Sequence, residues 1–111
     1  MYHNPSCSKS RGALELLRER DIEVEVVEYL RAPPDRAGLE RIVDAISDPP
    51  DALVRKDKRF KELGLDASQY TTRAAVVGLL LEHPELMERP VVFRGAKAVI
   101  ARPSERVLEL L

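Results

Sequence analysis

The stretch HNPSCSKSR, residues 3–11, lies between a short apolar start and leucines at helical spacing, and it holds the only cysteine of the chain. Cys7 therefore falls where a first strand ends and a first helix begins. The first N–H groups of a helix have no intrahelical partner, and the helix dipole adds partial positive charge to them. These groups, together with Lys9 and Arg11 if their side chains fold toward the sulfur, favour a thiolate over a thiol. The same donors would accept a tetrahedral oxyanion, so the stretch combines a candidate nucleophile with a candidate anion cradle.

A second interpretation of Cys7 stays open at this point. A lone cysteine is often a small buried hydrophobic residue with no chemical role. The pattern also reads as Cys-x-x-Ser, which is a redox Cys-x-x-Cys motif whose second thiol has become Ser10. Without a second cysteine the chain cannot close an internal disulfide, so any redox cycle needs a thiol from outside.

Composition excludes several classes of protein. A length of 111 residues fits one domain, residues 1–111, and a net charge of −1 gives no support to a nucleic-acid or membrane-surface role. One cysteine excludes a disulfide framework and a multi-cysteine metal site. No apolar run approaches the roughly 18 residues of a spanning helix, and no signal peptide opens the chain. We therefore expect a cytoplasmic protein.

Periodicity predicts an alternation of strands and helices. The expected elements are a clipped first strand over residues 1–3, a helix over 8–20, a strand over 22–26 continuing toward Tyr29, a helix from the N-cap Asp35 to near Ser47, a short helix over 53–55, a helix C-cap at Gly64, a helix from Thr71 or Thr72 to His83, a hairpin with strands 91–93 and 98–100, and a final helix from Pro103. Strand, helix and strand at the start predict a parallel pair with a right-handed crossover. The order βαβ…ββα predicts an α/β sandwich of thioredoxin-like order with a helical insertion.

Three arginines stand outside the charge patterns of the helices. Arg55 follows an apolar pair, Arg89 precedes a proline and a buried strand, and Arg102 ends the hairpin directly before another proline. Guanidinium groups suit a tetrahedral oxyanion, and three of them could surround one thiolate. Each could equally be a structural ion-pair residue, since most surface charge is merely solvated. Spacing alone does not decide between these interpretations.

Seven short segments complete a pattern: YHNPSCSKSR at 2–11, YL with PP at 29–34, LVRK at 53–56, LGL at 63–65, HP at 83–84, RPVV at 89–92 and RPSE at 102–105. With these segments, which follow one order from end to end, the chain closely resembles the glutaredoxin-linked arsenate reductases, whose fold is a variant of the thioredoxin fold. Each segment alone would be weak, but together they are very specific.

The resemblance implies that Cys7 is the nucleophile that attacks arsenate and that Arg55, Arg89 and Arg102 hold the oxyanion and the arsenic intermediates. The arginines would neutralise the substrate so that a thiolate can approach it. Glutathione, as co-substrate, would form the next adduct, and glutaredoxin would complete reduction to arsenite. We therefore expect arsenate or a similar oxyanion and glutaredoxin as partners, no bound cofactor, no metal, no nucleic acid, no membrane, and a monomer.

Further positions follow from the same resemblance. His3 and Ser10 match loop residues near the thiolate, Ser10 acting by hydrogen bonding and His3 by electrostatics. Pro90 matches a cis-proline placed against the active-site loop, a bond geometry that prolines tolerate. Two features depart from the family: the first strand is several residues shorter, and Ser8 and Lys9 stand where relatives often carry a small residue and threonine.

Three other functions remain as alternatives. The Spx-type transcription factors resemble arsenate reductases but typically carry Cys-x-x-Cys and lack the full arginine set, unlike this chain. A phosphatase-like arsenate reductase needs a Cys-x₅-Arg loop, and position 13 is alanine. A thiol oxidoreductase that shares the scaffold without arsenate activity stays open, because fold-level analogy does not settle function.

Overall fold

The computed structural model describes all 111 residues, and they divide into two compact units. The first unit contains Met1–Pro33 and Arg89–Leu111, and the second contains Pro34–Glu88. The expectation of one domain over residues 1–111 stays a prediction. No helix has the length and apolar character that a crossing of the lipid bilayer requires.

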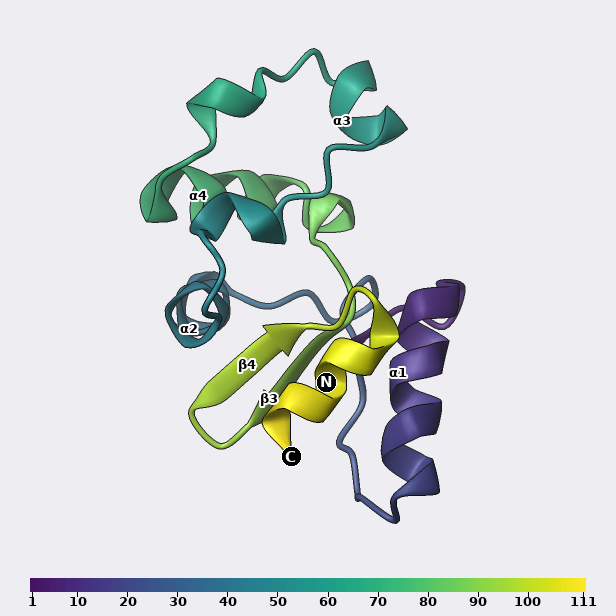
Figure 1. The fold of residues 1–111 in the computed structure, drawn as a ribbon. Helices are drawn as coiled ribbons and strands as arrows, with labels where there is room; N and C mark the ends of the chain where they lie inside the picture. The colour runs from purple at the N-terminus through teal and green to yellow at the C-terminus, as the bar shows by residue number, and fades with distance from the viewer. The chain divides into compact units, whose positions relative to one another are not determined.

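The first unit is built on a four-stranded mixed sheet with the order β2-β1-β3-β4. Figure 1 shows its β3–β4 hairpin. Its strands are β1 (Tyr2–His3), β2 (Val27–Glu28), β3 (Val91–Arg94) and β4 (Lys97–Ile100). The first two strands are parallel, β3 runs antiparallel to β1, and the β3–β4 hairpin is antiparallel. The prediction of a thioredoxin-like α/β order is confirmed, including the parallel first pair and the late hairpin.

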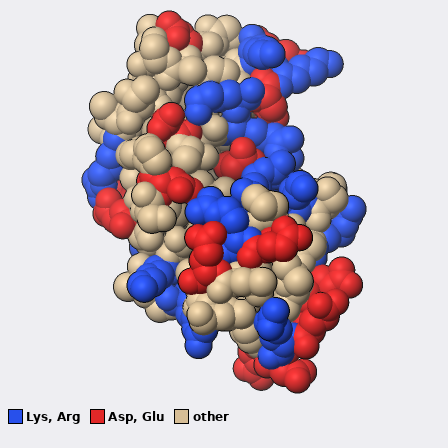
Figure 2. All heavy atoms as spheres, viewed as in Figure 1, with Lys and Arg blue, Asp and Glu red and all other residues tan.

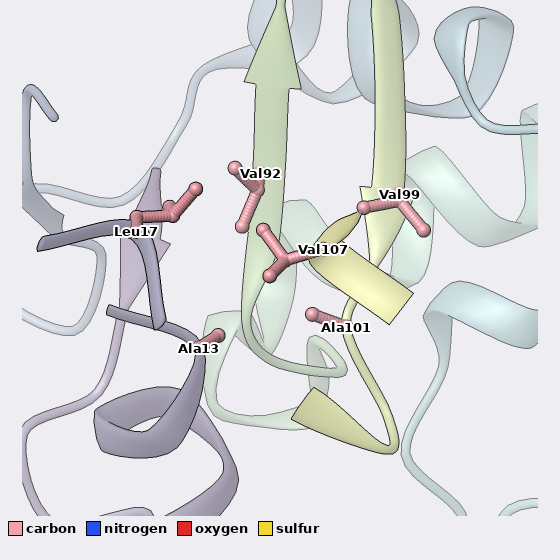
Figure 3. Packing of buried hydrophobic residues seen from close by; sticks show 6 residues of the cluster. All are labelled: Ala13, Leu17, Val92, Val99, Ala101 and Val107. Atoms are coloured by element: carbon pink, nitrogen blue, oxygen red, sulfur yellow. The ribbon is translucent and has the colours of Figure 1, made fainter. Parts of the chain in front are cut away.

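One face of this sheet is covered by α1 (Ser8–Glu19) and by the 3₁₀ helix η4 (Ser104–Leu110). Val92 and Val99 are directly paired across the hairpin, so their side chains project to the same face. They form a buried cluster with Leu17 of α1 and Val107 of η4, as Figure 3 shows. Burying each such side chain contributes about 1.5–3 kcal/mol, which fixes α1 firmly on the sheet.

The strand predicted over residues 22–26 and continuing toward Tyr29 forms only in its continuation. Only Val27–Glu28 form β2, pairing with Tyr2 and His3. Residues 22–26 alternate apolar and charged side chains as a strand does, but a strand also needs a partner, and β1 offers only two residues for pairing. Glu25 gains one contact, the amino group of Met1 donating to its carbonyl oxygen at 2.8 Å.

The second unit is helical. Its elements are α2 (Arg36–Ala45), η1 (Pro50–Leu53), α3 (Lys58–Glu62), η2 (Ala67–Gln69), α4 (Arg73–Glu82) and η3 (Pro84–Leu86). The predicted caps hold: Asp35 accepts from the N–H of Gly38 at 2.8 Å, and Thr72 starts α4. Gly64 follows α3 with φ of +68°, the left-handed conformation that favours glycine.

Figure 2 shows lysine and arginine side chains as well as aspartate and glutamate side chains on the surface. Lysine and arginine contribute 18 residues, and aspartate and glutamate contribute 19. The composition therefore has no basic excess of the kind that nucleic-acid binding would need.

Candidate active site

Cys7 occupies the N-cap position of α1, with φ of −96° and ψ of 123°. Its N–H donates to the carbonyl of Asn4 at 3.0 Å, and its carbonyl accepts from the N–H of Arg11 at 3.0 Å. Asn4 also accepts from the N–H of Ser6 through its side chain, which closes the turn locally. The turn and the helix thus fix the backbone of Cys7, and its thiol is free and partly exposed.

Four donors act on the sulfur and set its ionisation. Partial burial by itself raises the pKa of Cys7, but the N–H of Ser10, the guanidinium of Arg89, the N–H of Lys9 and the guanidinium of Arg102 outweigh it and lower that pKa to about 7. The side chain of Cys7 makes no capping hydrogen bond of its own to α1. The lowered pKa favours the thiolate, the nucleophilic form, at neutral pH.

Arg102 reaches the sulfur from the far end of the chain. Its Nη1 donates to Cys7 Sγ at 3.6 Å and to the carbonyl of Arg89 at 3.1 Å. The N–H of Ala101 donates to the carbonyl of Pro90 at 2.9 Å, which ties the two arginine segments together. Arg102 is thus in contact with the predicted nucleophile, and the guanidinium of Arg89 is a second donor that lowers the pKa of Cys7.

Both arginines precede prolines that are joined to them by cis peptide bonds, Arg89–Pro90 and Arg102–Pro103. The resemblance pointed to Pro90 as a cis-proline. The second cis bond, at Pro103, was not foreseen.

His3 and Ser10 form a buried pair beneath the turn. His3 Nδ1 lies 2.6 Å from Ser10 Oγ, and the same hydroxyl accepts from the N–H of Asn4 at 3.0 Å. Ser10 is fully buried and His3 is 6% exposed. The hydroxyl of Ser10 therefore anchors the turn, while its backbone N–H acts on the sulfur.

The pKa of His3 lies below the ordinary value. Burial is the main cause, the positive charges of Arg18 and Arg11 add to it, and Glu28 opposes it. His3 is consequently neutral at pH 7. In the tautomer that carries its proton on Nε2, the hydroxyl of Ser10 donates to Nδ1.

Arg55 belongs to the second unit, and its role beside Cys7 stays a prediction. The short helix predicted to hold residues 53–55 is η1, which ends at Leu53. Val54 instead forms an antiparallel bridge with Met87, and Arg55 follows it outside the helix. Arg55 donates its backbone N–H to Leu86 at 2.7 Å. Its guanidinium donates to Asp57 at 2.9 Å and, at 3.5 Å, to a second carboxylate on Glu88. Carboxylates thus orient this cation.

An open groove of about 570 Å³ runs along α1 from His3, Pro5 and Arg11 toward Arg18 and Glu19. It borders the Cys7 turn, but Cys7 does not line it. Glutamates and arginines both line the groove, so it carries no net preference for an anion. The structure holds no cluster of three or more histidine, cysteine, aspartate or glutamate side chains suited to a metal ion.

Residue-by-residue reasoning missed two contributors. The backbone N–H of Lys9 acts on the sulfur, whereas the sequence drew attention to its side chain. Asn4 organises the turn through its side chain, and the signal was available, since Asn-Pro-Ser is typical of a turn that asparagine closes by bonding its own backbone.

A cysteine of lowered pKa, placed at the start of the helix that follows the first strand of such a mixed sheet, defines a thioredoxin-like thiol protein. The model of the ArsC family matches residues 2–110 of the chain. The chain therefore belongs to the ArsC family.

Similar proteins agree with this assignment. An arsenate reductase of Neisseria meningitidis serogroup A is 42% identical over 113 aligned residues, which cover 100% of this chain and 96% of that protein. The uncharacterized protein YfgD of Escherichia coli is 41% identical, with 100% and 94% covered. The structure of an arsenate reductase from Vibrio cholerae superposes with a TM-score of 0.88 at 39% identity, covering 99% of this chain and 94% of that one.

Proposed function

We propose that this protein reduces arsenate to arsenite and that Cys7 is its nucleophile. The observation that carries the proposal is the convergence of Arg89 and Arg102 on a sulfur whose pKa is about 7. Family membership adds the substrate class, since relatives along the whole chain are named arsenate reductases. A guanidinium pair beside a thiolate also suits a tetrahedral oxyanion that must be brought close to a second anion.

The first step in this proposal is attack of the Cys7 thiolate on arsenic. A bond from sulfur to arsenic forms, and one oxygen leaves as water after protonation. The guanidinium groups of Arg89 and Arg102 stabilise the charge that remains on the arsenate oxygens. Arg55 would supply a third cation, as its match to the family pattern implies.

The reduction needs two electrons, and Cys7 alone cannot deliver them through an internal disulfide. Cys7 is the only cysteine of the chain, so external thiols must act. Glutathione would displace a second oxygen as water and form a mixed thiol adduct. A glutaredoxin thiolate would then attack the glutathione sulfur, form a disulfide with it and leave the electron pair on arsenic as As(III). Hydrolysis of the remaining bond releases arsenite and restores the Cys7 thiolate.

The same thiol chemistry favours a reducing compartment. A free, partly exposed cysteine of low pKa is readily oxidised where disulfides form. We therefore place the protein in the cytoplasm, where thiol donors are abundant, and we propose that it acts as a monomer.

The test is arsenate-dependent oxidation of NADPH, coupled through glutaredoxin, glutathione and glutathione reductase. We expect turnover with wild-type protein and none with Cys7→Ser. A second assay replaces the glutaredoxin system by thioredoxin and its reductase, which tests the thiol donor separately from the substrate. Activity with thioredoxin alone would support arsenate as the substrate and refute glutaredoxin as the donor. No arsenate-dependent turnover with either donor, alongside reduction of a simple disulfide, would assign the chain to the thiol oxidoreductases instead.

A further inference from the structure

Ser104 contacts the first turn of α1 from the opposite end of the chain. Its hydroxyl donates to the carbonyl oxygen of Lys9 at 2.7 Å, and the residue is 9% exposed. Ser104 is the first residue of η4, which packs closely along α1. The hydrogen bond is therefore a specific polar link within a mainly apolar contact.

Gly12 explains how the hydroxyl comes so close to the helix. A Cβ atom at Gly12 would lie 2.8 Å from Ser104 Oγ and 3.3 Å from Ser104 Cβ, and the first of these separations is one that real Cβ atoms do not adopt. Gly12 follows Lys9 by three residues, so both lie on the same side of α1. Glycine weakens the interior of a helix relative to alanine. The close approach of Ser104 explains why a glycine stands at position 12 inside α1.

The same short segment holds the Cys7 turn at two points. Arg102 places its guanidinium 3.6 Å from the sulfur, and Ser104, two residues further on, holds the carbonyl of Lys9. The N–H of Lys9 is one of the donors that act on the sulfur. A shift of Ser104 away from α1 would therefore move the N–H of Lys9 and the guanidinium of Arg102 relative to one another.

We propose that Ser104 is a positioning residue for the Cys7 thiolate, with Gly12 as the gap that lets its hydroxyl reach Lys9. The proposal rests on the proposed function and deepens it, because it explains how the proposed nucleophile is held at a fixed position relative to Arg102. Ser104 touches neither the sulfur nor the substrate in this account; it acts through the Lys9 carbonyl.

The test uses the ionisation of Cys7, which reports on positioning independently of arsenate. Because Cys7 is the only cysteine, the pH dependence of its alkylation by iodoacetamide gives one clean midpoint. We expect the midpoint of Ser104→Ala to rise by about 0.5–1 pH unit, since misplaced donors stabilise the thiolate less. In the coupled arsenate assay kcat/KM should fall about ten- to a hundredfold.

Gly12→Ala disturbs the same contact from the other side and should raise the midpoint in the same direction. The matched control is Gly78→Ala, a glycine-to-alanine change inside α4 where a Cβ meets nothing within 4 Å. The control should leave the alkylation midpoint unchanged. The double variant with Gly12→Ala and Ser104→Ala should shift the midpoint by less than the sum of the single shifts, because both changes act through one contact.

Circular dichroism and the thermal midpoint of each variant separate positioning from folding. A folded Ser104→Ala with a lowered Tm but an unchanged alkylation midpoint would overturn the proposal and leave Ser104 as a structural residue. If the wild-type protein fails to reduce arsenate while the midpoint still shifts in Ser104→Ala, the proposed function falls and the positioning role stands.

Discussion

Arg102 and Cys7 are 95 residues apart in the sequence, and Nη1 of the arginine lies 3.6 Å from Sγ of the cysteine. The sheet makes this contact possible. Tyr2 of β1 pairs with Val91 of β3, and β3 pairs with β4, so the end of the hairpin returns to the loop that follows β1. A cation is thus fixed beside a sulfur by strand pairing, without a flexible segment having to close.

Arg102→Ala should raise the pKa of Cys7 and slow arsenate reduction. The guanidinium donates to the sulfur, so its loss removes a group that stabilises the thiolate. Loss of one preorganised donor costs about 10²–10³-fold in rate, and we expect kcat/KM to fall within that range. Arg94→Ala is the control, since Arg94 is exposed on the same hairpin and donates only to the carbonyl of Leu110. Wild-type kinetics in Arg102→Ala would remove this residue from the site.

Ser10→Ala should destabilise the fold. The change deprives two buried groups of a shared partner, the N–H of Asn4 and Nδ1 of His3. Leaving a buried polar group unsatisfied costs about 1–3 kcal/mol, and urea unfolding should record a loss of that size in the free energy of unfolding. Ser47→Ala, at an exposed position, is the comparison and should be near neutral. Equal stability of the two variants would contradict the anchoring role of the Ser10 hydroxyl.

The stability of the protein should fall in mild acid because of His3. Burial lowers the pKa of His3 below its ordinary value of 6.5, so the unfolded chain binds the proton first as the pH drops. The contribution of a neutral His3 is complete above pH 6.5 and is lost as the pH falls through the lower pKa of the folded state. The measurement is the free energy of unfolding between pH 7.5 and about 5, in wild type and in His3→Gln. Both proteins carry the same carboxylates, so the difference between their curves isolates the contribution of His3. Parallel curves for the two proteins would show that His3 does not supply this slope.

Arg55→Ala should lower kcat/KM if this arginine acts on the substrate as the family pattern implies. Loss of one cation from an oxyanion site should weaken transition-state stabilisation by about 2–3 kcal/mol. Arg59→Ala, a nearby exposed arginine that pairs with Glu85, is the matched control and should have little effect. Comparable kinetics in the two variants would reduce Arg55 to a structural partner of Asp57 and Glu88.

The helices and the hairpin could be predicted because their signals are local. Asp35 and Thr72 mark helix starts by the hydrogen bonds that their own side chains make, and a glycine marks the hairpin turn, where Gly95 has φ of +62°. The strand predicted over residues 22–26 and continuing toward Tyr29 forms only at Val27–Glu28, because its signal is not local. Strand formation depends on a partner elsewhere in the chain, and β1 provides only Tyr2 and His3.

The candidate site likewise contains parts with local sequence signals and parts that depend on contacts between distant segments. Helix-start chemistry predicted a stabilised thiolate at Cys7 from local sequence alone. Nothing local predicted that Arg102 would reach it, and only the resemblance to a family supplied that expectation. The link from Ser104 to Lys9 had no sequence signal, because a serine after a proline reads simply as a helix start.

The most direct test of the account is the pH dependence of Cys7 alkylation in the wild-type protein, with and without arsenate. We predict a midpoint at about pH 7 and slower alkylation when arsenate is bound to the arginines around the sulfur. A midpoint near the ordinary thiol value of 9.0, with no protection by arsenate, would contradict it.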